Sequence, residues 1–436
     1  HVGMNHTVLA LTTYNGELTA GGNFSTAGGT TVNHIARWNP TNGWRTLSSG
    51  QFFHGTNGPV HSLTTFNGQL IAGGAFSNAK NEGAQRIAMW SQPGGWLPLG
   101  NGLTGSQPTV HSLSVYNGSL IAGGSFSGSG QGGPALNRVA QWTGGSWSQL
   151  STGLNSTVYA LTPFNNLLVA GGAFFSTPPG GSNQDVNGVA GWDGFMWHDM
   201  GLGLVQPVVY ALIIHDGVLY AGGQFMLEDS PTAANVARWN SAISRWEPLA
   251  GGANGTVRAM TVYDGDLIVA GDFTMVGGPA GVAVNRIARL NGSSWESLDG
   301  GGALPGTSMF VLTAFDPDLA AGGNFSTPSD THLNRVATWQ ACPVLPCSAD
   351  IAPPGGDGFV NVGDLLAVVS AWGACPAPPN ACTADIEPPG GNAVVNIHPL
   401  LAAVSPWGAC PQEIWWGGRG PSPSHPLIEP AKLVEK

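Results

Sequence analysis

An all-β chain whose residues 1–341 form a seven-bladed β-propeller is predicted by three features of the sequence. The phrase Ala-Gly-Gly-x-Phe occurs seven times at intervals of 48 to 52 residues, a period typical of propellers and solenoids. Most copies follow a hairpin signal, Asn-Gly or Asp-Gly, and precede two tryptophans at fixed places. The copies, of which the sixth is shortened, begin at Ala20, Ala72, Ala122, Ala170, Ala221, Ala270 and Ala321.

The third repeat shows how one unit divides into strands. Val110 to Tyr116 alternates small or polar with apolar residues, and Asn117-Gly118 then predicts a tight turn into a second strand. Gly123-Gly124 is expected to end that strand where a neighbouring backbone or aromatic group approaches closely. Two further strands are expected at residues 137–142 and 147–150. Four antiparallel strands in about fifty residues make one propeller blade.

The recurring tryptophans are predicted to be core residues rather than platforms for sugars. One blade cannot bury its own faces, so large aromatic side chains between blades hold a radial array together. The third-strand positions are Trp38, Trp90, Trp142, Trp192, Trp239 and Trp339, with Leu290 as the exception. The fourth-strand positions are Trp44, Trp96, Trp147, Trp197, Trp246 and Trp295.

The apolar strand ending in Gly-Gly, followed by Asn-Arg-Val-Ala and spaced tryptophans, resembles the secreted kelch and galactose-oxidase type of propeller. The resemblance covers roughly residues 1 to 341 and implies the fold, but it leaves the activity open. Galactose oxidase chemistry needs copper held by Tyr and His with a modified Cys, and no cysteine precedes Cys342. We therefore expect no enzyme of that kind.

The seventh repeat stops at Trp339-Gln340-Ala341, before its fourth strand. Either a short N-terminal piece was lost, which leaves this blade with three strands, or the C-terminal tail fills the gap. The chain begins at His1, as a mature secreted protein or a trimmed fragment would.

A candidate ligand site follows from one variable position, just inside the start of the innermost strand of each blade. These strands start on the face with the long loops, and rigid scaffolds usually bind through such loops. The seven residues are Leu9, His61, His111, Tyr159, Tyr210, Arg258 and Phe310. We predict that His61, His111, Tyr159, Tyr210 and Arg258 bind a ligand at the channel mouth, although half-exposed positions that tolerate any residue would vary in the same way.

Composition limits the classes of partner. Only 9% of the residues are charged, the net charge is -11, and no Lys/Arg cluster occurs along the chain, which argues against nucleic acid and anionic membranes. No apolar run is long enough for membrane insertion. All five cysteines lie in the last quarter of the chain, which indicates a small disulfide-linked domain and an extracellular or cell-surface location.

That last quarter contains a second repeat. A Pro-rich linker at 342–346 leads to residues 347–411, where two copies lie 35 residues apart, and an extended tail follows at 412–436. The phrase Asp-Gly-x-Val-Asn-x-x-Asp-Leu-Leu, from Asp357 to Leu366, resembles the type I dockerin, a paired loop-helix module related to the EF-hand.

The dockerin resemblance implies calcium in the first copy only. Its ligands would be Asp350, Asp357, the carbonyl of Phe359, Asn361 and Asp364. Asp350 lies too early in the loop for the usual spacing, and the second copy has lost most of its acids.

The symmetric placement of the cysteines suggests disulfides Cys347–Cys375 and Cys382–Cys410, which leaves Cys342 free, bonded to another chain or exchanged with Cys347. A Cys375–Cys382 bond would overturn that pairing.

Three functions remain open. The first is a secreted, non-enzymatic binding or scaffold propeller, tethered to an assembly or cell surface by the dockerin-like module, with a cohesin-like protein or a glycan as its partner. The second is a self-assembling subunit of an extracellular sheath, layer or filament. The third is a carbohydrate-active enzyme at the loop-rich face, which would need two carboxylates about 5 to 10 Å apart. The acidic residues of the repeats scatter without shared placement, so binding or scaffolding is favoured.

Overall fold

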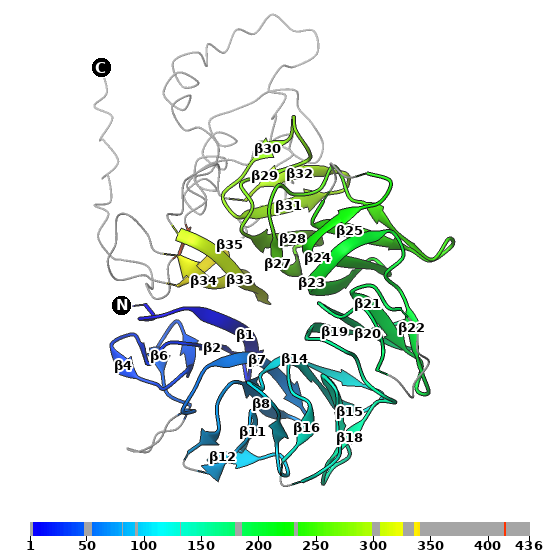
Figure 1. Ribbon diagram of the computed structural model, residues 1–436. Coiled ribbons are helices and arrows are strands. Elements are labelled where there is room, and N and C mark those ends of the chain that lie inside the picture. The colour runs from blue at the N-terminus through cyan, green and yellow to red at the C-terminus, as the bar shows by residue number, and fades with distance from the viewer. Residues whose placement is uncertain are drawn as a thin grey trace, which may run out of the picture.

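The computed structural model describes residues 3–47, 55–80, 82–91, 95–130, 132–178, 185–230, 234–298, 306–325, 335–340 and 414–415. These residues form seven four-stranded antiparallel sheets and no helix, so none of them belongs to a helix that could cross a membrane. Figure 1 shows the sheets arranged as blades around a central axis, with one strand of each blade innermost. The seven-bladed propeller predicted from the repeats is confirmed. The linker and the dockerin-like module lie outside the described residues.

Each blade runs outward in chain order from its inner strand. The inner strands are β1 (Val8–Tyr14), β7 (Val60–Phe66), β14 (Val110–Tyr116), β19 (Val158–Phe164), β23 (Leu204–His215), β27 (Val257–Tyr263) and β33 (Gly306–Phe315). The second strands are β2 (Glu17–Gly22), β8 (Gln69–Gly74), β15 (Ser119–Gly124), β20 (Leu167–Gly172), β24 (Val218–Leu227), β28 (Asp266–Gly271) and β34 (Asp318–Phe325).

The outer half of each blade is shorter. The third strands are β5 (Ile35–Asn39), β11 (Ile87–Ser91), β17 (Val139–Trp142), β21 (Val189–Trp192), β25 (Val236–Asn240), β31 (Ile287–Asn291) and β35 (Val336–Gln340). The fourth strands are β6 (Gly43–Arg45), β12 (Gly95–Pro98), β18 (Trp147–Gln149), β22 (Trp197–Asp199), β26 (Arg245–Pro248), β32 (Ser294–Ser297) and β36 (Ile414–Trp415). Small two-stranded ribbons pair β3 (Thr26–Ala27) with β4 (Thr30–Thr31), β9 (Asn78–Ala79) with β10 (Glu82–Gly83), β13 (Leu103–Thr104) with β16 (Gly128–Ser129), and β29 (Met275–Val276) with β30 (Val282–Ala283).

Tight turns join the first and second strands, as the Asn-Gly and Asp-Gly signals predict. Asn15 and Gly16 have φ values of 51° and 74°, and Asp264 and Gly265 have 52° and 78°. Positive φ at both central residues matches the right-handed twist of the flanking strands. The third strand of blade three begins at Val139, two residues later than expected, because Asn137 and Arg138 also have positive φ.

The second strand ends at the Gly-Gly pair in blade three, as predicted, and in most other blades, whereas β24 and β34 continue past it. The first glycine of the pair faces the next blade. A Cβ on Gly21 would lie 2.5 Å from Cγ1 of Val60, the first residue of β7. The same glycine-to-valine contact recurs between Gly73 and Val110, Gly123 and Val158, Gly171 and Val209, Gly222 and Val257, and Gly322 and Val8. Glycine is therefore required because it gives a branched side chain of the next blade room to pack.

Blade six departs from this rule in a compensated way. The pairing of β28 places Ala270 where the other blades have the first glycine, and the residue facing it from blade seven is Met309 instead of valine. Ala270 and Met309 are buried in the same cluster. Methionine has one heavy atom on Cβ where valine has two, so it can accommodate the additional methyl group of alanine.

The tryptophans are core residues, as predicted. All are buried except Trp142, which is half-buried. Third-strand and fourth-strand tryptophans face each other in register, as Trp90 and Trp96 do with ring centroids 5.4 Å apart. Several fourth-strand indole N–H groups also donate to a carbonyl of the preceding blade, at 3.0 Å from Trp147 to Leu99 and 3.1 Å from Trp197 to Leu150. These indoles therefore link two blades by packing and by a hydrogen bond.

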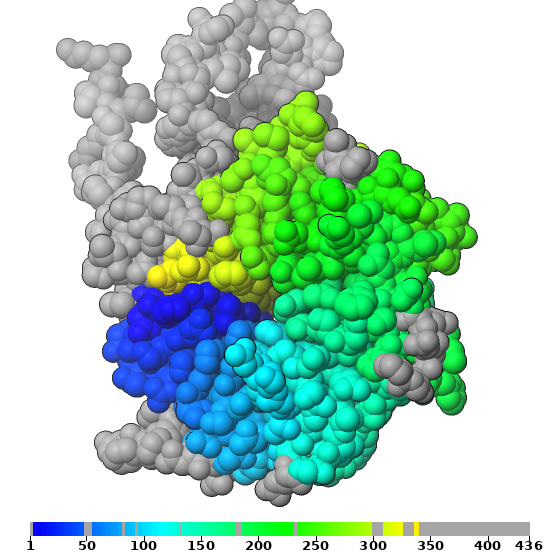
Figure 2. All heavy atoms as spheres, viewed as in Figure 1, coloured from blue at the N-terminus to red at the C-terminus, as the bar shows by residue number. Residues whose placement is uncertain are grey.

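Packing and a returning tail close the ring. In Figures 1 and 2 blade seven, in yellow, lies between blade one, in blue, and blade six. Phe315 packs on Trp38 with ring centroids 6.0 Å apart. β36 pairs with β35, with Trp415 opposite Thr338 and Ile414 opposite Trp339. Of the two alternatives for the seventh blade, the structure therefore shows the one in which the C-terminal tail supplies the fourth strand.

Replacing Gly21 by alanine should lower the free energy of unfolding by about 1–3 kcal/mol, because its Cβ would clash with Val60. Adding Val60→Met, which copies the Ala270–Met309 arrangement, should recover much of the loss. Urea denaturation measures both effects. Gly83→Ala is the matched control, because a Cβ there meets nothing within 4 Å. Equal stability of Gly21→Ala and Gly83→Ala would contradict the role given to the glycine.

Replacing both Ile414 and Trp415 by proline should lower the melting temperature, because proline cannot donate to the ladder with β35. We expect a loss of about 1–3 kcal/mol in blade stability. Ser424→Pro, in the same tail, is the control. Identical melting curves for all three proteins would show that the tail does not stabilise blade seven.

Candidate functional site

The seven predicted mouth positions share one local structure: each is the extra residue of a β-bulge. The register between the inner and second strands shifts between Val8 and Ala10 in blade one, so that Leu9 has no partner. The other shifts fall at His61, His111, Tyr159, Tyr210, Arg258 and Phe310. A bulge leaves its extra residue outside the ladder and re-aims the side chain. We call these seven residues the bulge ring.

The second glycine of each Gly-Gly pair explains the bulge. A Cβ on Gly22 would overlap the carbonyl oxygen of Thr7, which precedes β1, and the second glycine of every other blade meets the equivalent carbonyl. In blade one this carbonyl accepts a hydrogen bond of 2.9 Å from the N–H of Asn23, one residue past the glycine. The inner strand thus crosses directly over the glycine before the extra residue begins.

The bulge ring forms a continuous arc over six blades. Successive ring centroids lie 5.3 Å apart for His61 and His111, 5.1 Å for His111 and Tyr159, and 5.0 Å for Tyr159 and Tyr210. The guanidinium carbon of Arg258 then lies 5.3 Å from the Tyr210 ring centroid and 5.2 Å from that of Phe310. The structure therefore brings together all five predicted binding residues, and each is half-buried. Their role in binding stays a prediction.

An acidic residue that the sequence reasoning did not select completes this arc. Asp272 accepts hydrogen bonds from Nε of Arg258 at 2.8 Å and pairs with its NH2 group at 2.7 Å. It follows the second glycine of blade six, and the equivalent positions are Asn23, Ala75, Ser125, Ala173, Gln224 and Asn324. Asp272 is the one acidic residue among these seven positions, and this difference was the signal that could have identified it.

Burial sets the protonation of the arc. It lowers the pKa of His61 to about 4, and burial together with the neighbouring His61 lowers the pKa of His111 to about 4. Burial, helped by Tyr210, raises the pKa of Tyr159 above its ordinary value. At neutral pH the mouth therefore presents two neutral imidazoles and two phenols, which both donate and accept hydrogen bonds, beside the cation of Arg258.

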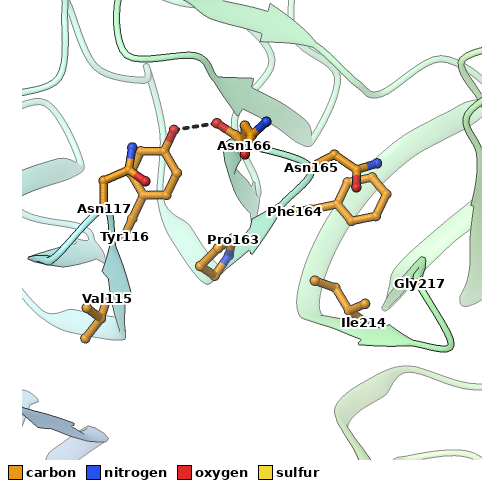
Figure 3. A pocket seen from close by; sticks show the side chains of 9 residues that line it. All are labelled: Val115, Tyr116, Asn117, Pro163, Phe164, Asn165, Asn166, Ile214 and Gly217. Atoms are coloured by element: carbon orange, nitrogen blue, oxygen red, sulfur yellow. Dashed lines mark hydrogen bonds between the residues drawn. The ribbon is translucent and has the colours of Figure 1, made fainter.

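A hollow lies at the other end of the channel, on the face that carries the hairpin turns between first and second strands. Its volume is about 280 Å³, and it is lined by Val115, Tyr116, Asn117, Pro163, Phe164, Asn165, Asn166, Ile214 and Gly217. Figure 3 shows that the Tyr116 hydroxyl is engaged there with the carbonyl of Asn166, at 2.6 Å. No charged side chain lines this hollow. Its wall therefore offers less recognition chemistry than the bulge ring.

The predicted calcium ligands and disulfides lie outside the described residues. These are Asp350, Asp357, Phe359, Asn361 and Asp364 for calcium, and Cys347, Cys375, Cys382 and Cys410 for the disulfides. Within the described part of the propeller, no group of three or more His, Cys, Asp and Glu residues could hold a metal ion.

Comparisons with known proteins bear on the fold. Residues 264–294, in blade six, match a family described as a β-propeller domain of unknown function, DUF5122. No curated protein matches the sequence significantly. The chain is similar to the WD40 β-propeller domain of Doa1 (14% identity, 76% of this chain and 96% of that one, TM-score 0.46) and to the computationally designed Ika8 protein (15% identity, 78% and 98%, TM-score 0.43).

It is also similar to the extracellular domain of BT4673 from B. thetaiotaomicron (11% identity, TM-score 0.47). That match covers 75% of this chain and 38% of the other chain.

Stability should fall on acidification because of the two channel histidines. An imidazole whose pKa is about 4 when folded and 6.5 when unfolded binds more protons in the unfolded chain, so its contribution is lost as pH falls from about 6.5 to 4. We expect a loss of about 3 kcal/mol per imidazole. The double variant His61→Gln/His111→Gln should flatten this slope in urea denaturation, whereas His6→Gln, at an exposed residue, should keep it. An unchanged slope in the double variant would refute the assignment.

Proposed function

We propose that this protein is an extracellular, non-catalytic binding propeller whose ligand site is the bulge ring at the loop-rich mouth of the channel. One observation supports this above all: the unbroken arc from His61 to Phe310, in which every neighbouring pair of side chains is in ring or cation contact. Side chains that pack on one another in this way are preorganised, so a ligand loses little free energy in ordering them.

A glycan fits this surface best. Aromatic rings offer apolar faces to the C–H side of a sugar, while imidazole and phenol groups donate to and accept from its hydroxyls. The ion pair of Arg258 and Asp272 adds both a cationic donor and an anionic acceptor beside the rings. The mouth therefore combines apolar and hydrogen-bonding contacts, as a small polar ligand requires.

Catalysis has less support than binding. Hydrolysis of a glycosidic bond ordinarily needs two carboxyl groups on either side of the bond. The bulge ring and the seven positions after the second glycines contain one carboxylate, Asp272, and Arg258 is paired with it. The mouth therefore lacks the second carboxyl group that such a hydrolysis requires at these positions.

Attachment to a larger assembly rests on the resemblance of residues 347–411 to a dockerin, with calcium held by the first copy. Isothermal titration of the full chain with calcium, followed by pull-down on immobilised cohesin domains, tests this part separately from the propeller. Asp364→Ala should abolish a calcium signal that comes from the first copy. Absence of both signals in the unmodified chain would remove the tether from the proposal.

A structural subunit is the second candidate, because large apolar side chains are exposed on blades four and five. Phe195 is 86% exposed, Ile243 57% and Leu202 52%. Such side chains on neighbouring blades are what a contact between copies would bury. Size-exclusion chromatography with light scattering over a range of concentrations distinguishes the two functions: stable monomers would exclude the subunit, whereas filaments or layers would favour it.

Glycan binding should depend on the two tyrosines. Tyr159→Ala/Tyr210→Ala removes the centre of the arc and should weaken binding by at least tenfold, since loss of stacking costs about 1.4 kcal/mol or more. A glycan array read with unmodified protein identifies the probe, and titration of that glycan measures the effect. Phe195→Ala is the control, because it removes an exposed aromatic side chain from the outer edge of blade four. Equal losses in the two variants would place the site elsewhere.

A further inference from the structure

Five arginines from four blades gather around the bulge ring. Each guanidinium group contacts a residue one or two positions past the second glycine of a blade, and these positions lie beside the bulges. The five are Arg86, Arg138, Arg258, Arg286 and Arg335. Successive members of this set lie 28 to 120 residues apart in the chain, so the sequence shows no arginine cluster.

Two of the arginines belong to blades two and three, which also carry the two histidines. Arg86 donates from NH1 to the carbonyl of Phe76 and from Nε to that of Pro108, both at 2.9 Å. Pro108 precedes His111 by three residues, so this guanidinium reaches from blade two to the start of the inner strand of blade three. Arg138 donates from NH1 to the carbonyls of Ser125 and Phe126, at 2.6 and 3.2 Å. Backbone carbonyls hold both groups in place, and neither group pairs with a carboxylate among the described residues.

The arginines of blades six and seven surround Arg258. Arg286 donates from NH1 to the backbone carbonyl of Asp272 at 2.9 Å, next to the ion pair that Asp272 makes with Arg258. Arg335 donates from NH1 to Oδ1 of Asn324, the equivalent position in blade seven. Asp272 thus contacts two guanidinium groups, that of Arg258 through its carboxylate and that of Arg286 through its backbone carbonyl.

The mouth is therefore cationic in a protein with a net charge of -11. Among the described residues, Arg86, Arg138, Arg258 and Arg335 make one ion pair with a carboxylate, that of Arg258 with Asp272, and the two histidines are neutral at pH 7 because their pKa values are about 4. Other described acids on this face lie in loops between second and third strands, where Glu228 and Asp229 pair with Arg245, and at the end of β22, where Asp199 accepts hydrogen bonds from the N–H groups of Asn187 and Gly201. The opposite face carries Glu17, Asp216, Asp264, Asp266, Asp316 and Asp318 at or beside its hairpin turns.

We infer that the bulge ring binds an acidic glycan, in which a carboxylate or sulfate on a sugar faces the arginines while the sugar ring lies against Tyr159 and Tyr210. This inference rests on the proposed function and narrows its ligand class. A guanidinium is always charged and binds planar anions well. Few charged side chains surround the mouth, which reduces the competition of other acids for the guanidinium groups. The positive charge of these groups therefore acts on the ligand at close range.

Nucleic acid is the other polyanion with flat rings, and it fits the molecule less well. A polymer with a phosphate at every unit needs a basic groove that follows its backbone. Here the arginines are confined to one mouth, and the opposite face and the net charge of -11 repel a long polyanion.

Matched glycan pairs test the inference. Titration calorimetry with the full chain compares an oligogalacturonate with its methyl ester, and a sulfated galactan oligosaccharide with its desulfated form. Each pair shares its sugar backbone and differs in whether its acidic group is charged, esterified or removed, and the two pairs separate carboxylate from sulfate. We expect at least one acidic member to bind about tenfold or more tighter than its neutral partner. Raising NaCl from about 0.05 to about 0.5 M should reduce that preference, because salt screens the charge.

Substitutions separate charge from fold. Arg138→Gln should lower the preference for the acidic member about fivefold and leave affinity for the neutral member nearly unchanged. Arg138→Lys keeps the charge and should retain most of the preference even if it loses hydrogen bonds. Arg238→Gln is the matched control, since Arg238 is 54% exposed and pairs with Glu247 away from the mouth.

The outcomes are distinguishable. Equal affinity for acidic and neutral members would overturn the inference and leave the proposed binding function standing, whereas no binding to either member or to any glycan would overturn both. An equal effect of Arg138→Gln and Arg238→Gln would also overturn the inference. Tighter binding of a single-stranded oligonucleotide than of every acidic glycan would assign the mouth to nucleic acid instead.

Discussion

The close approach of a backbone carbonyl to the second glycine of each Gly-Gly pair determines the geometry of the channel mouth. The carbonyl of Thr7 and its equivalents lie where a Cβ would stand, so only glycine lets the inner strand cross there. The strand then bulges by one residue, and that residue leaves the ladder. The same glycine in every blade therefore places seven variable side chains at one end of the channel.

The blades themselves are held by contacts that leave the bulge ring free to vary. The first glycine gives room to a valine of the next blade, and four of the fourth-strand indoles donate to carbonyls of the preceding one. Both interactions are buried and use residues of the repeat. The bulge residue takes part in neither, because it is half-buried and unpaired. Exchange at this position therefore changes the mouth with little effect on the packing between blades.

Much of the fold could be predicted because each blade repeats the same local signals. The hairpin turns, the strand order and the buried tryptophans follow from Asn-Gly pairs and from aromatic spacing. Aligning the repeats also located the bulge ring. The bulge itself was missed, although Val8 and Leu11 are both buried three residues apart, which breaks strict alternation. The arginine cluster was missed because its members come together only when the ring closes. The sequence left two alternatives open for blade seven, because the pairing of Ile414–Trp415 with β35 joins segments that lie far apart in the chain.

The departures from sevenfold symmetry indicate how a ligand would lie. Blades four and five place tyrosines in the bulge ring and have Gly188 and Asn235 where their neighbours have arginine at the start of the third strand. Blades two and three on one side, and six and seven on the other, supply the guanidinium groups. An uncharged aromatic platform is thus flanked by two cationic sectors. A sugar stacked on the tyrosines would place its acidic substituents toward those flanks. The asymmetry of the ring therefore favours a glycan that runs across the mouth from one cationic sector to the other.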